Sequence, residues 1–155
     1  MTGIPPAATR ASVESELDAA MAWAGRHQWT VTWTPEDLTL RADTYHRPVG
    51  RQVEVVATCD GYRALPPLWR FVRPGTNETG PACHPSAGPA SIFHGSAIIC
   101  APWSRLAYAE LGGPHGDWSG PAAWLQVPTG AVAHHLADML AVIDAHLRAS
   151  PGLMA

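Results

Sequence analysis

The apolar residues of this chain change their spacing early in the sequence. They first recur every three or four positions, which is the spacing of one helix face. That face comprises Val13, Leu17, Met21 and Ala24. In residues 29–33 and in later stretches, apolar and polar residues alternate, which is typical of a strand with one buried face. A chain with both periods is neither all helix nor all sheet, so the pattern predicts an α+β fold.

Four short runs predict strands, and residues that favour turns separate them. The runs are residues 29–33, 38–42, 53–57 and 68–72, and the separating residues include Pro35, Pro48, Gly50, Pro66 and Pro67. Sequential strands with short connections usually pair with their neighbours. The pattern therefore predicts a four-stranded antiparallel meander.

Helices are expected on both sides of the meander. Ser12 is expected to cap the first helix and Gly25 to end it. The last helix is expected to be capped by Thr129, with one apolar face made of Val132, Leu136, Met139, Leu140, Ile143 and Leu147. Pro5-Pro6 favours a flexible tail over residues 1–9, and residues 10–150 are long enough for one domain.

Composition narrows the classes of partner. The 155 residues are 46% hydrophobic and 15% charged with a net charge of −3, which favours neither disorder nor a nucleic-acid-binding surface. No apolar run reaches the ~20 residues that span a bilayer, and no signal peptide is evident. We therefore expect a cytoplasmic protein without a membrane partner.

Three cysteines without Cys-x-x-Cys spacing argue against a disulfide framework, and neither a metal nor another cofactor is expected.

Residues 74–128 hold most of the glycines and prolines of the chain. Only Ile98-Ile99 and a short helix over residues 104–111 are expected to be regular there. A long irregular segment inside a compact domain is usually functional. The functional site is therefore expected in this segment.

Several short motifs follow one another from Gly61 onward. In order, they are Gly61-Tyr62, Pro66-Pro67, Phe71, Pro74, His84-Pro85-Ser86, Ile98-Ile99-Cys100 and Asp117-Trp118-Ser119-Gly120-Pro121. This order resembles the core of the ubiquitin-conjugating enzymes. In that family a Tyr-Pro and Pro-Pro segment precedes a strand, and then come His-Pro-Asn, the active cysteine and Trp-Ser-Pro. Helix, meander, irregular segment and helix is also the order of the family's fold, and the chain is closest to a shortened, bacterial-type member.

The resemblance implies that Cys100 carries a ubiquitin-like protein as a thioester. The modifier would come from an activating enzyme and pass to an acceptor protein, a role that in bacteria is linked to phage defence. A cysteine suits this chemistry because its thiolate is a strong nucleophile and also a good leaving group. No cofactor is needed on this chain, because the activating enzyme would consume the ATP.

The resemblance also assigns neighbours to Cys100. His84 matches a histidine that is usually structural, and Ser86 stands where the family has the asparagine that supports the oxyanion. The serine side chain is shorter, and the segment between His84 and Cys100 is longer than in the family, so His94 and Ser96 remain alternative donors. Asp117 lies where family members often place an acidic residue that orients the incoming amine.

Two other functions stay open. A catalytically inactive relative would keep the fold and bind a ubiquitin-like protein or an activating enzyme. A cysteine hydrolase would pair Cys100 with His94 or His115, with Asp117 as the orienting carboxylate. The organisation of helix and meander does not resemble that of papain-like hydrolases.

Overall fold

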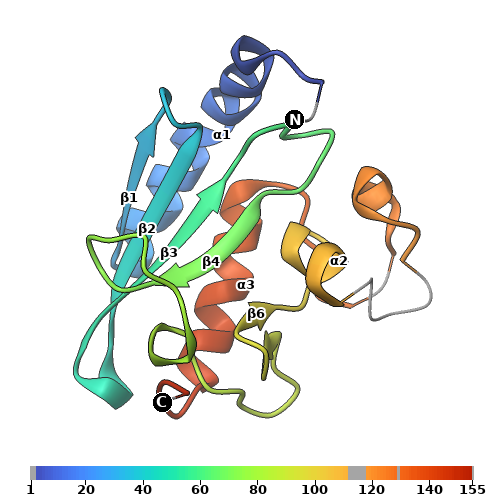
Figure 1. The fold of residues 1–155 in the computed structure, drawn as a ribbon. Helices are drawn as coiled ribbons and strands as arrows, with labels where there is room; N and C mark the ends of the chain where they lie inside the picture. Colours follow the sequence, from blue (N-terminus) through green and yellow to red (C-terminus); the bar gives the residue numbers. More distant parts are fainter. Residues whose placement is uncertain (1–2, 112–117, 129, 155) are drawn as a thin grey trace.

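The computed structural model describes residues 3–111, 118–128 and 130–154. Helix α1 (Pro6–His27) and helix α3 (Leu136–Ala149) lie side by side against one face of a four-stranded sheet (Figure 1). The predicted α+β class is confirmed. Within the described ranges, no helix is both long and apolar enough to cross a membrane.

The sheet is the predicted antiparallel meander. Its strands are β1 (Trp29–Thr34), β2 (Thr39–His46), β3 (Arg51–Thr58) and β4 (Leu68–Val72), and they pair in the order β1-β2-β3-β4. Between β2 and β3 the chain reverses through a 3₁₀ turn, η1 (Arg47–Val49), which Gly50 closes with a left-handed φ of 66°. The Gly50 N–H donates to the His46 carbonyl at 2.9 Å, so this turn fixes the register of the two longest strands.

The core lies between the sheet and the two helices. The strands contribute a buried set that largely follows the predicted alternation, namely Trp29, Val31, Leu40, Ala42, Val53, Val55, Ala57, Trp69 and Phe71. Helix α3 contributes Leu136, Met139, Leu140, Ile143 and Leu147. Burying each large side chain contributes about 1.5–3 kcal/mol, so the match of the two apolar faces dominates the stability of the fold.

The expected bounds of the first helix are wrong at both ends. Helix α1 begins at Pro6, so residues 6–9 belong to it rather than to a flexible tail. Proline is favoured in the first helical turn, where its missing N–H would have no partner. The helix continues through Gly25 because the buried Trp23 and Ala24 still pack on the core. It ends at His27, and the next residue, Gln28, adopts a left-handed conformation.

The start of the last helix also differs from the prediction. Helix α3 begins at Leu136, and Val132, expected on its apolar face, precedes it and is 41% exposed. The expected cap, Thr129, lies outside the described residues. The Leu136 N–H donates to the Glu16 carboxylate of α1 at 2.7 Å. A side chain distant in sequence therefore caps this helix.

A second, smaller unit follows the main sheet. Strands β5 (Phe93–His94) and β6 (Ile98–Ile99) form a two-stranded hairpin, and helix α2 (Arg105–Leu111) comes after it. The short helix expected over residues 104–111 is confirmed. Two further 3₁₀ turns, η2 (Pro81–Cys83) and η3 (Pro121–Gln126), lie on either side of this unit in sequence. Helix α2 and strand β6 contact each other, and both contact β4 of the main sheet.

Candidate functional site

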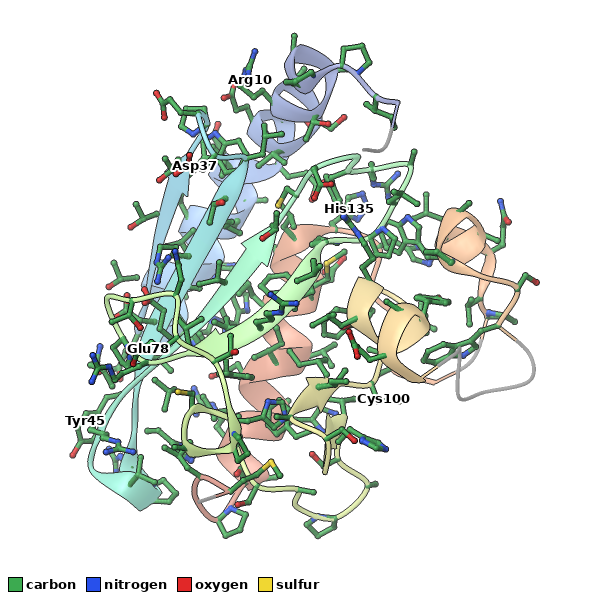
Figure 2. All side chains as sticks on the ribbon, viewed as in Figure 1. Arg10, Asp37, Tyr45, Glu78, Cys100 and His135 are labelled. Carbon is green, nitrogen blue, oxygen red and sulfur yellow. The ribbon has the colours of Figure 1, made fainter. Side chains whose placement is uncertain are left out.

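Cys100 lies directly after β6, at the open end of the small hairpin. Its backbone N–H donates to the Ile92 carbonyl at 2.7 Å, which extends the β5–β6 pairing by one residue. The side chain is partly buried. Figure 2 shows Cys100 below helix α2. Its position combines a fixed backbone with a partly exposed thiol.

The hairpin is built by local turn geometry. The Ala97 N–H donates to the His94 carbonyl at 3.0 Å, and Ala97 adopts a left-handed φ of 62°. A tight turn followed by a left-handed residue is a common three-residue hairpin loop. The register that this loop sets pairs His94 with Ile98 and Phe93 with Ile99.

His146 of α3 takes the place of the next hydrogen bond in the hairpin. The sequence motifs assigned no role to this residue. Its Nδ1 accepts the Ile92 N–H at 3.3 Å, and its ring meets Phe93 edge-on. In a complete pair, the Ile92 N–H would donate to the carbonyl of Cys100. His146 therefore ties the strand opposite Cys100 to α3. A sequence signal exists, because His146 follows Ile143 by three positions on the apolar side of the helix.

His94 shares one face of the hairpin with Cys100. Side chains alternate along a strand, so Cys100 and Ile98 lie on the same face, together with His94 opposite Ile98. Diagonal positions of this kind have α-carbons about 7–8 Å apart. The Nδ1 atom of His94 accepts the Ser96 N–H at 3.1 Å. The neutral ring therefore carries its proton on Nε2, where it can donate a hydrogen bond.

The chain after Cys100 is anchored to the main domain at two points. Trp103 is fully buried, meets Trp69 edge-on, and donates from Nε1 to the Ala131 carbonyl at 2.7 Å. Arg105 donates to the Asp60 carboxylate and to the Pro66 carbonyl, each at 2.9 Å. These contacts fix the start of α2 against the loop before β4, and they hold the segment that carries Cys100 from its other end.

Partial burial affects the chemistry of Cys100. It raises the pKa of the Cys100 thiol above its ordinary value, because a low-dielectric surrounding disfavours the thiolate. The thiol therefore remains mostly protonated at neutral pH. Such a thiol is less reactive than one that a neighbouring cation or a helix N-terminus activates.

His84 belongs to the core rather than to a reactive surface. Its ring is 2% exposed and lies edge-on to Phe71 and Phe93. Burial, together with a smaller effect of the nearby His94, lowers the pKa of His84 to about 4. His84 is thus neutral at physiological pH, and its part in the site is to support Phe93 of strand β5.

Ser86 is held by the C-terminal segment. Its N–H donates to the Gly152 carbonyl at 2.8 Å, and its carbonyl accepts the hydroxyl of the buried Ser150 at 2.7 Å. The neighbouring Pro85 forms an isolated bridge with Leu153. These bonds tie Ser86 to the C-terminal segment, whereas Cys100 and His94 share one face of the hairpin.

The remaining expected site residues lie in the last part of the irregular segment. Asp117 and His115 are outside the described residues. Trp118, which follows them, has its ring 5.4 Å from that of Tyr108 on α2. Among the residues that the structure describes, no group of three or more His, Cys, Asp or Glu side chains is arranged to hold a metal ion.

Comparison with known proteins adds no relative to this description. The chain matches no protein-family model, no curated protein and no solved structure.

Proposed function

We propose that this protein is a ubiquitin-conjugating-type acyl carrier. Cys100 would receive the C-terminal acyl group of a ubiquitin-like protein from an activating enzyme and pass it to an acceptor. The observation that carries the proposal is the placement of Cys100: a partly exposed thiol after β6, between the anchored hairpin and the anchored start of α2. The motif order that resembles the family converges on the same residue.

The proposed reaction has two balanced steps. In the first, the Cys100 thiolate attacks the thioester carbonyl on the activating enzyme, a new C–S bond forms, and the thiolate of that enzyme leaves and takes up a proton. In the second, an acceptor nucleophile attacks the same carbonyl, and Cys100 leaves as a thiolate while the nucleophile loses its proton. Both steps pass through an oxyanion, which a positioned hydrogen-bond donor stabilises.

His94 is the described side chain best placed for that donor role. It shares the hairpin face with Cys100, and its Nε2–H is left to donate because Nδ1 accepts the Ser96 N–H. The same tautomer argues against a hydrolase with a Cys100–His94 pair, since a general base needs an unprotonated nitrogen facing the thiol. Ser86 is tied to the C-terminal segment and is the weaker donor candidate.

An inactive adaptor is the second candidate. The raised pKa of the Cys100 thiol and the distant anchoring of Ser86 are the observations that favour it. Such an adaptor would bind the ubiquitin-like protein or the activating enzyme without forming a thioester.

A charging assay distinguishes the two candidates. The protein is mixed with a bacterial ubiquitin-like protein, its activating enzyme and ATP, and is then run on a non-reducing gel. We expect a modifier-sized shift that dithiothreitol removes and that Cys100→Ala abolishes. Cys83→Ala is the matched control and should charge normally, because Cys83 lies outside the hairpin. Binding of the modifier without a shift would favour the adaptor instead.

A further inference from the structure

A separate cavity lies at one end of the main sheet. This is the end far from the start of α1. It has a volume of about 450 Å³ and is lined by residues from the start of β3, the end of β4, turn η2 and the C-terminal segment. Small-molecule sites usually measure about 300–1,000 Å³ and are mostly apolar. Cys100, His94 and His146 do not line this cavity, so it is distinct from the candidate site above.

The walls of the cavity are largely apolar. Val53 and Val72 are buried strand residues, and Pro74, Ala82 and Leu153 complete the apolar lining. Leu153 is held in place by its bridge to Pro85. The apolar surface is therefore part of the folded framework.

Positive charge lies beside these apolar walls. Arg51 and Arg73 both line the cavity. Arg73 is paired with Glu78 at 2.9 Å. The Arg51 side chain is exposed and has no ion pair or side-chain hydrogen bond to the part of the chain described here. An unpaired guanidinium next to apolar walls suits a ligand with an anionic head and an apolar body.

We propose that this cavity binds a small amphipathic carboxylate, with the apolar chain along the apolar lining and the carboxylate at Arg51. This inference goes beyond the acyl-carrier function and does not depend on it. The thiol of Cys83, which also lines the cavity, provides a reporter inside the site.

The test measures the rate at which N-ethylmaleimide labels Cys83 in a Cys100→Ala variant. The labelled fraction is read from the intact mass of the protein. Cys59 is fully buried, so Cys83 is the accessible thiol of this variant. Saturating octanoate is expected to slow the labelling at least fivefold. Octanol lacks the carboxylate and acetate lacks the chain, so each should protect far less.

Two substitutions locate the two halves of the ligand. Arg51→Gln should raise the octanoate concentration that gives half-protection about tenfold, because it removes the charged partner. Arg26→Gln, on the exposed surface of α1, is the matched control and should leave that concentration unchanged. Ala82→Asp places a carboxylate on the exposed rim of the cavity and should abolish protection without disturbing the core.

Three results would overturn the proposal. They are the absence of protection by octanoate, equal protection by octanol, and an unchanged half-protection concentration in Arg51→Gln. Labelling of Cys100 in a Cys83→Ala variant checks for a general effect of the additive on the labelling reaction, and octanoate should leave that rate unchanged. Equal slowing at Cys100 would show that the slowing at Cys83 is not specific to the cavity, which would also refute the site.

Discussion

Replacing Glu16 with alanine is expected to lower the free energy of unfolding by about 3–5 kcal/mol. The Glu16 side chain is only 11% exposed and serves three partners. It accepts the Tyr62 hydroxyl at 2.9 Å and the Leu136 N–H at 2.7 Å, and its carboxylate lies 3.7 Å from the Arg63 guanidinium. Its removal leaves a buried hydroxyl and a helix N-terminus without their acceptor, and it takes away the carboxylate beside Arg63.

Urea unfolding at pH 7 measures this effect, and the chain offers a matched control. Asp18→Ala removes the same charge from the same helix at an exposed position, and should change the unfolding free energy by less than about 0.5 kcal/mol. Glu16→Gln keeps one acceptor oxygen and should fall between the two. Equal stability of the Glu16→Ala and Asp18→Ala variants would contradict the view that Glu16 joins α1, the loop after β3 and α3.

Acidification from pH 7 to pH 5 is expected to cost about 2 kcal/mol of stability through His84 alone. The folded-state pKa of His84 is lowered to about 4, whereas the unfolded chain has the ordinary value near 6.5. Between these values the unfolded state binds a proton that the folded state does not. Stability therefore falls as the pH drops from about 6.5 to about 4 and becomes independent of His84 below that.

His84→Phe tests this assignment. Phenylalanine matches the aromatic surroundings formed by Phe71 and Phe93 and cannot titrate. The variant should lose most of the pH dependence measured by urea unfolding between pH 7 and pH 5. A smaller dependence should remain, because burial also lowers the pKa of His46 and His146. An unchanged slope in His84→Phe would show that other groups cause the acid sensitivity.

The sequence predicted the regular parts of the fold because local patterns determine them. Alternation and turn residues located all four strands of the meander, and helical spacing located α1 and α3. Proline and glycine on either side located the short helix α2. The helix ends were missed where tertiary contacts override local signals. Leu136 is capped by Glu16, which is 120 positions away, and no window of sequence contains both residues.

The site was predictable only in part. Cys100 stands out from the motif order, but its pairing with Ile92 depends on the turn over residues 95–97. The left-handed residue of that turn is Ala97 rather than Gly95, so the sequence does not mark the turn geometry. His146 belongs to a distant helix and reaches the hairpin only through folding. The burial of His84 likewise follows from packing between two phenylalanines distant from each other in sequence.

Thioester exchange at Cys100 is the most direct test of the central claim. The protein is incubated at pH 8 with a short glycine-terminated peptide thioester of mercaptoethanesulfonate, and the acyl adduct is located by intact mass and peptide mapping. We expect one adduct on Cys100, reversed by dithiothreitol, absent in Cys100→Ala and faster as the pH rises, because the thiolate is the attacking form. A folded protein that gives no adduct, or that acylates Cys83 in preference to Cys100, would contradict the account.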